Sequence, residues 1–367
     1  MKKIMILSSI LSLLGLQACT GVKEIGRDAF STLVSAGDVQ LVDCRTADEY
    51  IAGHMEGAVL IDYKSADFKE KALGMLDKEK GVAVYCRTGR RSRAAGEILA
   101  AEGFKVFSLA GGIVAWKEGG LPVTKALVLY YSQTGTTRAV AEEIASRTGA
   151  DIASFDVTEP YDGSFDETVE RCLTERATGK KPVLKAPDCD FSKYGLIFLG
   201  YPIWFGTYAP PVEALIASEK FEGKVIVPFC TFGSGGLQSS TADLVKALPE
   251  ADIREGYGVR TARIGKASAE IGRFLIENGW TEGKAEPLPE YSEQVPVSEK
   301  EAAIFDEACS GYQFPLGTPV SCGSRKTADG MDYLFTAETE DLDGNSSSST
   351  IYIEVRDGKA EFTQVVR

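Results

Sequence analysis

Short apolar clusters separated by helix-like segments recur in two successive stretches of this 367-residue chain. In the first stretch, clusters at 39–43, 82–86 and 104–109 show little polar alternation, and 92–102 has the composition of a helix. Continuous apolar runs of this length are typical of parallel strands that are buried on both faces. We therefore expect 22–123 to fold as a small parallel α/β sheet.

The same pattern restarts near residue 125 and extends to about 282. A stretch of this size is sufficient for one doubly wound α/β domain. Its predicted strands are 126–131, 196–201 and 225–230, and its predicted helices are 137–147 and 271–278.

The C-terminal part of the chain has a different pattern. Residues 283–299 are rich in proline and glutamate and are predicted to be an extended linker. Residues 300–367 are predicted to form a small α+β module, in which the serine run 346–349 is a hairpin loop. The module's predicted elements are a helix near 298–309 and strands near 318–326, 331–339, 349–356 and 360–366.

The N-terminus carries a targeting signal. Lys2 and Lys3 precede an apolar run at 4–16, which has the length of a signal-peptide core and is too short for a stable membrane span. The small residue before Cys19 resembles the lipobox of bacterial lipoproteins. That resemblance implies a signal peptide at 1–18, a lipid on Cys19 that anchors the chain to a membrane, and an extracytoplasmic location in the bacterial cell envelope, at the periplasm or outer membrane. The alternative is an ordinary secretory signal with an accidental cysteine.

Charge and histidine content exclude several classes of function. The chain has 53 acidic and 40 basic side chains, which gives a net charge of −13 and no electrostatic footprint for nucleic acid. Its one histidine, His54, excludes His-rich metal sites and limits catalysis that needs a histidine base. In an exported chain, Cys172 with Cys189 and Cys309 with Cys322 are candidate disulfides, although spacing alone leaves these pairings open.

Cys86 occupies a position that favours a thiolate. It follows an apolar strand and precedes a helix that begins near Ser92. Free N–H groups and the positive end of the helix dipole stabilise an anion at such a helix start, and three nearby arginines add positive charge. Both effects lower the pKa of a thiol and make it nucleophilic without a histidine. The alternative is a buried cysteine at a strand end, beside surface arginines.

Several spaced motifs in 23–123 resemble the rhodanese family. These motifs are 41–45, 49–50, 53–58, 85–92, 110–112, Trp116 and 121–123. The resemblance implies an α/β domain that transfers sulfane sulfur through a Cys86 persulfide, with thiosulfate as a donor and a thiol or cyanide as acceptor. It also implies that the amides of 87–91 hold the persulfide and that Arg87 and Arg90 attract the donor. The predicted catalytic residues are Cys86, Arg87, Thr88, Gly89, Arg90 and Arg91.

Loop length separates sulfur transfer from phosphate hydrolysis. Rhodanese-like phosphatases resemble this segment but have a loop one residue longer, with an arginine six positions after the cysteine. Ser92 stands at that position, so the resemblance favours sulfur transfer. His54, in a Gly53–His54 turn, and the pair Asp43 and Arg45 are predicted to be structural.

A second candidate site begins with the hydroxyl-rich segment 132–137, which lies between a strand and a helix. Backbone N–H groups at a helix N-terminus hold phosphate, and small hydroxyl side chains add hydrogen bonds. The segment lacks both the lysine of a Walker A loop and the G-x-G-x-x-G pattern of nicotinamide-binding folds. It resembles the FMN phosphate loop of flavodoxins.

Two further segments support the flavodoxin resemblance, because each follows a predicted strand. In that family, segments such as 200–206 and 229–236 cover the isoalloxazine ring. The resemblance implies a sheet of order 2-1-3-4-5, noncovalent FMN, and electron transfer to a redox protein partner. Trp204 is predicted to stack on the flavin, with an ordinary buried aromatic as the alternative. The predicted FMN-binding residues are Ser132, Gln133, Thr134, Gly135, Thr136, Thr137, Pro202, Ile203, Trp204, Phe205, Gly206, Thr231, Phe232, Gly233, Ser234, Gly235 and Gly236.

The segment 326–333 lies between two predicted strands and resembles the hairpin of cystatin-like domains. That likeness suggests protease inhibition, whereas a plain packing or binding module is the simpler interpretation. Tyr333 and Phe335 alternate with polar neighbours and are predicted core residues.

The predicted function is a membrane-anchored sulfurtransferase fused to an FMN-dependent electron-transfer domain. The fusion motivates the hypothesis that flavin electrons release the persulfide sulfur. One alternative is a flavodoxin-type electron carrier whose rhodanese segment binds or regulates a partner. Another is an interaction protein in which both sites are inactive.

Overall fold

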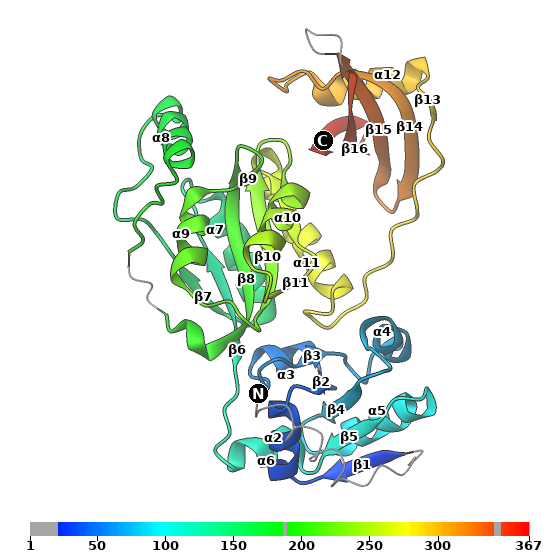
Figure 1. The fold of residues 1–367 in the computed structure, drawn as a ribbon. Coiled ribbons are helices and arrows are strands. Elements are labelled where there is room, and N and C mark those ends of the chain that lie inside the picture. Colours follow the sequence, from blue (N-terminus) through cyan, green and yellow to red (C-terminus); the bar gives the residue numbers. More distant parts are fainter. Residues whose placement is uncertain (1–20, 186–188, 341–345, 367) are drawn as a thin grey trace. The chain divides into compact units, whose positions relative to one another are not determined.

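The computed structural model describes residues 21–185, 189–340 and 346–366 (Figure 1). The chain divides into two compact units, Met1–Val123 and Thr124–Arg367. The predicted signal peptide and Cys19 lie outside the described residues. Within the described residues, every helix is too short or too polar to span a bilayer.

The first unit contains a five-stranded sheet of order β1-β5-β4-β2-β3, in which every neighbouring pair is parallel. This arrangement confirms the predicted α/β fold, although β1 was not predicted. The strands are β1 (Val22–Ile25), β2 (Val39–Asp43), β3 (Val59–Leu60), β4 (Gly81–Tyr85) and β5 (Val106–Leu109). The helices are α2 (Arg27–Ser35), α3 (Ala47–Ile51), α4 (Phe68–Met75), α5 (Arg90–Ala101) and α6 (Gly112–Glu118).

A buried ion pair stabilises the end of β2. The guanidinium of Arg45 lies 2.6 Å from the carboxylate of Asp43, and both side chains are almost completely buried. Arg45 also donates to the carbonyl of Gly53. These contacts confirm the predicted structural pair, which holds the turn after α3 against the sheet.

The second unit contains a parallel sheet of order β11-β10-β8-β6-β7, and β12 also pairs with β10. Counted along the chain, this is the predicted 2-1-3-4-5 order. Its strands are β6 (Lys125–Tyr130), β7 (Asp151–Ser154), β8 (Tyr194–Trp204), β9 (Thr207–Tyr208), β10 (Val225–Phe232), β11 (Asp252–Ile253) and β12 (Tyr257–Arg260). Its helices are α7 (Thr136–Thr148), α8 (Phe165–Thr178), η1 (Phe191–Lys193), α9 (Pro210–Ser218), α10 (Leu237–Ala247), η2 (Thr261–Lys266) and α11 (Ala267–Glu277).

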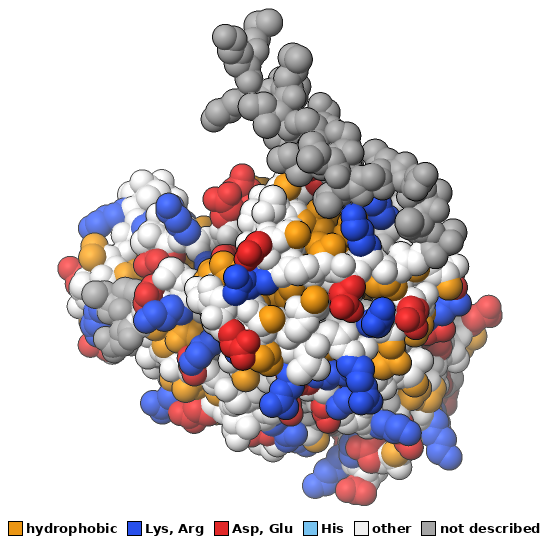
Figure 2. Space-filling view, turned by 90° about the horizontal axis from the view of Figure 1, so that it is seen from below, with side chains coloured by type: hydrophobic (Ala, Val, Ile, Leu, Met, Phe, Trp, Pro, Cys, Tyr) orange, Lys and Arg blue, Asp and Glu red, His pale blue; other side chains and the backbone are white. Residues whose placement is uncertain are grey.

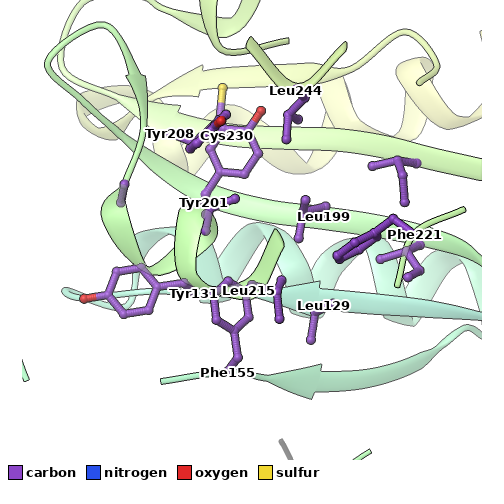
Figure 3. Packing of buried hydrophobic residues seen from close by; sticks show 14 of the residues in the cluster. Leu129, Tyr131, Phe155, Leu199, Tyr201, Tyr208, Leu215, Phe221, Cys230 and Leu244 are labelled. Carbon is purple, nitrogen blue, oxygen red and sulfur yellow. The ribbon is translucent and has the colours of Figure 1, made fainter. Parts of the chain in front are cut away.

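Helices cover both faces of this sheet. On one face, Leu129 and Leu199 of the sheet pack with Leu215 of α9 and Leu244 of α10 (Figure 3). On the other face, Phe198 contacts Trp280, which follows α11. Alternate residues of a strand therefore enter different cores, which explains why these strands read as continuous apolar runs.

The C-terminal part of the second unit is one helix and an antiparallel sheet of order β13-β14-β15-β16-β17. The elements are β13 (Val295–Pro296), α12 (Glu299–Cys309), β14 (Thr318–Thr327), β15 (Gly330–Glu340), β16 (Ser346–Arg356) and β17 (Lys359–Val366). Tyr333 and Phe335 are buried, as predicted. The cystatin resemblance stays a prediction.

Two details of this part differ from the sequence-based expectation. The serine run is not a hairpin loop, because Ser346 to Ser349 belong to β16 and pair with β15. Strand β15 is long enough to pair with all four serines. Of these, Ser346, Ser347 and Ser348 are exposed. In addition, the predicted linker contributes β13 to the sheet.

The candidate disulfides are not formed. Cys172, Cys309 and Cys322 are free thiols, so neither candidate pair is bridged. Cys309 interacts with Arg260, whereas Cys322 interacts with Glu301, so the two thiols have different surroundings. The expected pairings were wrong because spacing in the sequence does not determine which side chains meet.

Acidic and basic side chains are intermingled on the face drawn in Figure 2. On that face the carboxylates are dispersed among basic side chains. A dispersed pattern of this kind is typical of a solvated protein surface.

Candidate functional site

The Cys86 loop connects β4 to α5 at the carboxyl edge of the first sheet. The helix begins at Arg90, two residues earlier than predicted, because Gly89 adopts a positive φ of 96° as the N-cap. This conformation costs glycine little and lets the chain turn sharply into the helix. The first free N–H groups of α5 are consequently close to Cys86.

Helix α6 holds the other side of this loop. The N–H of Ile113 donates to the carbonyl of Cys86 at 2.9 Å, and the N–H of Val114 donates to the carbonyl of Arg87 at 3.2 Å. A Cβ on Gly112 would lie 2.4 Å from the Cys86 carbonyl oxygen, so only glycine fits there. Because α6 binds the loop carbonyls, the loop N–H groups are left to face the sulfur.

The Cys86 thiol lies in a hydrogen-bonding cradle and is 1% exposed. The N–H of Gly89 donates to its Sγ at 3.2 Å. Burial disfavours the charged thiolate, but hydrogen bonds from Ser92, Thr88 and Gly89 outweigh burial and lower the pKa of Cys86. Hydrogen bonds, rather than the arginine charges emphasised by the sequence, are the main effects that lower this pKa.

The three arginines of the loop have different environments. Arg91 donates to both carboxylate oxygens of Glu49, at 2.7 and 2.8 Å, so its charge is largely engaged. Arg87 and Arg90 are exposed, as is Thr88. The two exposed guanidinium groups remain available to attract an anion to the mouth of the loop.

His54 has no part in this loop. Its Nδ1 lies 2.9 Å from the carbonyl oxygen of Tyr50, and its ring stacks on that residue's ring. Burial lowers the pKa of His54 to about 4, so the ring is neutral at ordinary pH. The prediction of a structural histidine is confirmed.

The hydroxyl-rich segment forms a tight turn between β6 and α7. The Oγ of Ser132 accepts hydrogen bonds from the N–H groups of Gly135 and Arg138, at 3.1 and 3.2 Å. Gly135 is the N-cap of α7, with a positive φ of 88°. A helix that begins on a glycine turn presents free N–H groups to an anion.

Three loops at the carboxyl edge of the second sheet meet at one cavity of about 710 Å³. This volume lies in the range that holds a cofactor-sized ligand. The lining residues that the sequence predicted are Gln133, Thr134, Ile203, Trp204, Phe205, Gly206, Gly233, Ser234, Gly235 and Gly236. The other predicted residues lie beside the cavity rather than in its lining, namely Ser132, Gly135, Thr136, Thr137, Pro202, Thr231 and Phe232.

A buried hydrogen bond fixes the first loop to the third. The hydroxyls of Thr137 and Thr231 lie 2.8 Å apart, at the start of α7 and on β10. Both residues therefore position the cavity walls rather than line them.

Trp204 stands at the tip of β8, where the chain reverses into β9 through Phe205 and Gly206, both with positive φ. Its ring meets those of Tyr161 and Tyr131 edge-on, with centroids 5.0 and 6.1 Å apart. Trp204 is half-buried and lines the cavity. These edge-to-face contacts fix the orientation of the Trp204 ring in the cavity wall.

The sequence missed part of the lining. Phe165 begins α8 and is 82% exposed, directly after a capping box at Ser164 and Glu167 that could have identified this helix start. No sequence pattern indicated that residues of the C-terminal sheet line the cavity, because their position depends on how that sheet packs against the α/β domain. The missed lining residues are Gly163, Phe165, Thr168, Val169, Gln238, Ser239, Phe314, Val365 and Val366.

The residues present fit FMN. The cavity lining combines residues of the phosphate-type turn with an aromatic ring and glycine-rich backbone. Flat apolar walls with a few convergent polar groups suit a ring system with a phosphate tail.

Two family comparisons match the two α/β domains. The sequence model described as Rhodanese-like domain matches residues 27–119, and the model described as Flavodoxin matches residues 125–269. The protein named Sulfurtransferase from Allochromatium vinosum is 35% identical over 104 residues, which are 28% of this chain and 94% of that protein. Thiosulfate sulfurtransferase GlpE from Coxiella burnetii is 39% identical over 97 residues, which are 26% of this chain and 87% of that protein.

Among solved structures, a flavoprotein in complex with FMN from Lactobacillus acidophilus NCFM is 23% identical, with a TM-score of 0.34. That likeness covers 39% of this chain and 97% of the other. The two sulfurtransferases are matched over nearly their whole length, and the segment matched by the rhodanese-like model contains the Cys86 loop. The chain belongs to the rhodanese family, and in it a rhodanese-like domain is followed by a flavodoxin-like domain.

Proposed function

We propose that this protein is an envelope-anchored sulfurtransferase, in which Cys86 carries sulfur as a persulfide, fused to an FMN-binding electron-transfer domain. The observation that carries the first part is the Cys86 Sγ in its cradle of loop hydrogen bonds, with a lowered pKa. The sulfurtransferase relatives support the same reading.

The sulfur chemistry follows from the loop. The Cys86 thiolate attacks the outer sulfur of thiosulfate, a new S–S bond forms, and sulfite leaves with the electron pair of the broken bond. The N–H groups around Sγ stabilise the resulting persulfide anion. A thiol or cyanide then takes the outer sulfur and regenerates the thiolate. Arg87 and Arg90 attract the anionic donor.

The second part of the proposal concerns the cavity of the flavodoxin-like domain. Bound FMN supplies one- or two-electron transfer. The turn at 132–137 would hold the phosphate, and the loop 233–236 would line the ring-binding part of the cavity. Trp204 would lie against the ring and exclude water. A redox protein partner exchanges electrons with this domain.

Location is also part of the proposal. The pattern around Cys19 supports lipidation and attachment to the membrane of the bacterial envelope. We expect the full chain to sediment with membranes in a bacterial host. A Cys19→Ala variant is expected to lose the lipid and move to the soluble fraction, and unchanged membrane attachment would contradict the anchor.

One purified sample tests both activities. We expect a flavin absorption spectrum after addition of FMN, together with thiosulfate:cyanide sulfurtransfer that Cys86→Ser abolishes. Flavin binding without any sulfurtransfer would favour the electron-carrier alternative, in which the rhodanese segment binds a partner. A colourless protein without sulfurtransfer would favour the interaction-protein alternative.

Coupling between the two domains has its own test. Protein with a preformed Cys86 persulfide is mixed with a chemical reductant, with and without FMN loaded. Faster loss of the persulfide in the FMN-loaded sample supports coupling, and equal rates in both samples would contradict it.

A further inference from the structure

A second cysteine lies beside the catalytic loop. Cys44 directly follows β2, and Cys86 directly follows β4. These strands are parallel neighbours with Asp43 opposite Tyr85, and the N–H of Cys44 donates to the carbonyl of Tyr85 at 2.8 Å. Cys44 and Cys86 are the residues that directly follow this last registered pair.

The two side chains also share a face of the sheet. Val42, Cys44, Val84 and Cys86 all belong to one buried cluster, as expected for alternate residues of paired strands. Neighbouring strands lie about 4.8 Å apart, which is within the Cα separation of roughly 4.4–6.8 Å that a disulfide spans. A bridge between residues at these neighbouring positions is therefore compatible with the spacing of the two strands.

The thiols influence each other electrostatically. Burial, the Asp43 carboxylate and the charge on Cys86 together raise the pKa of Cys44 well above its usual value. Cys44 is therefore a neutral thiol at ordinary pH, and it still has a proton to give. Its side chain is 0% exposed, so bulky external reagents do not reach it.

We propose that Cys44 is a resolving thiol, which attacks the Sγ of persulfidated Cys86 and expels the outer sulfur as sulfide. The proposal rests on the proposed sulfurtransferase function and adds a second outcome for the bound sulfur. When no acceptor is present, the domain releases sulfide and stores a Cys44–Cys86 disulfide.

The step is balanced within the domain. The Cys44 Sγ–Cys86 Sγ bond forms, and the bond between Cys86 Sγ and the outer sulfur breaks. The outer sulfur takes that bond's electron pair and the Cys44 proton, so it leaves as hydrosulfide. The sulfane sulfur is reduced by two electrons, and the two cysteine sulfurs are oxidised to the disulfide. A dithiol reductant then opens the disulfide and restores both thiols.

The test uses the whole protein, reduced, treated with thiosulfate, freed of excess donor and incubated without an acceptor. In wild type we expect the mass of one added sulfur, followed by a mass two hydrogens below that of the reduced chain, with one sulfide released per chain. Peptide mapping is expected to show Cys44 joined to Cys86, and this measurement needs no variant.

Cysteine variants test whether the Cys44 thiol reacts or only fills space in the core. Cys44→Ser and Cys44→Ala are expected to form the persulfide and to keep it, whereas Cys309→Ser, which alters a thiol far along the chain, should behave as wild type. If the Cys44 variants do not fold, the wild-type peptide map still decides. A persulfide that decays equally fast in wild type and Cys44→Ala would overturn the inference and leave the proposed function intact. Failure of wild type to form any persulfide would overturn both.

Discussion

Ser92 determines how readily Cys86 ionises. Its hydrogen bonds to Cys86 are the strongest of the effects that lower that thiol's pKa, and its hydroxyl is also held by the Gly89 carbonyl and by Ser108. We predict that Ser92→Ala raises the Cys86 pKa. Thiolate would then form at higher pH, and the rate of persulfide formation at neutral pH would fall roughly tenfold, since hydrogen bonds to charged groups contribute about 1.5–3 kcal/mol.

The measurement is the pH dependence of Cys86 alkylation and of sulfurtransfer. Both curves should move to higher pH in Ser92→Ala. Ser108→Ala is the control, because it removes a contact of the Ser92 hydroxyl without touching the thiol. Coincident curves for wild type and Ser92→Ala would show that the loop amides alone set this pKa.

In the proposed FMN site, we expect Trp204 to contribute most directly to flavin affinity. Aromatic contacts contribute about 0.5–1.5 kcal/mol beyond the area that they bury, so Trp204→Leu should weaken FMN binding up to roughly tenfold. Trp204→Phe should retain most of the affinity. Titration of the apoprotein with FMN, followed by flavin fluorescence, measures both. Equal affinity for wild type and the leucine variant would mean that the indole does not contact the ring.

At the scale of elements, helix α6 is as important to the sulfur site as α5. Its first turn binds the carbonyls of the Cys86 loop, and Gly112 has a positive φ of 60° in close contact with that loop. We predict that Gly112→Ala destabilises the first unit by more than about 2 kcal/mol and reduces sulfurtransfer, because both the backbone conformation and the contact oppose a Cβ.

Urea unfolding of the variant gives its free energy of unfolding. Gly74→Ala is the matched control, because that glycine lies in α4 with open space around it. It is expected to stabilise the protein by about 0.4–1 kcal/mol. A Gly112→Ala variant as stable and as active as wild type would show that the loop has room to move.

The elements that the sequence predicts well are those whose signal is local. Apolar runs predict the buried strands before Cys86 and Ser132. The glycine turns after them predict the loop and helix that follow. Helix α5 begins two residues earlier than predicted, because the left-handed conformation of Gly89 sets the first residue of the helix. The serine run was misassigned, because the pairing of Ser346 with Glu340 overrides its low strand propensity. The pocket contacts of Val365 and Phe314 depend on packing between sheets, which no local pattern encodes.

Across the second unit, an ionic cluster joins the α/β sheet to the C-terminal sheet. Arg263, whose side chain is 4% exposed, contacts Glu270 and Glu354 at 2.6 Å each, and Lys266 contacts Glu354 at 3.0 Å. Nearby, the N–H of Val365 donates to the carbonyl of Ser234 at 2.9 Å, which brings β17 to the cavity wall. The C-terminal sheet therefore helps to build the cavity in which we propose that FMN binds.

This cluster predicts a pH dependence of stability. Burial opposes the charge on Glu354, but Arg263 and Lys266 outweigh burial and lower its pKa from 4.5 to about 2. A depressed carboxylate pKa stabilises the folded state above about pH 4.5, and this stabilisation is lost as pH falls towards 2. Thermal unfolding across this range should show the loss in wild type and a flatter profile in Glu354→Gln.

Removal of the arginine tests the same cluster at neutral pH. Arg263→Ala removes the arginine partner of Glu270 and Glu354, of which Glu354 keeps Lys266, and is expected to cost about 1.5–3 kcal/mol. The C-terminal sheet should then become easier to cleave by protease, and FMN affinity should fall. Unchanged protease resistance in Arg263→Ala would show that apolar packing alone holds the two sheets together.

The central claim for the whole molecule is that one chain carries sulfur on Cys86 beside a flavin-binding domain. The most direct measurement is the intact mass of the full protein after thiosulfate treatment. We predict one added sulfur atom in wild type, removed by cyanide as thiocyanate, and none in Cys86→Ser. Folded, FMN-binding wild-type protein that gains no sulfur would contradict the claim.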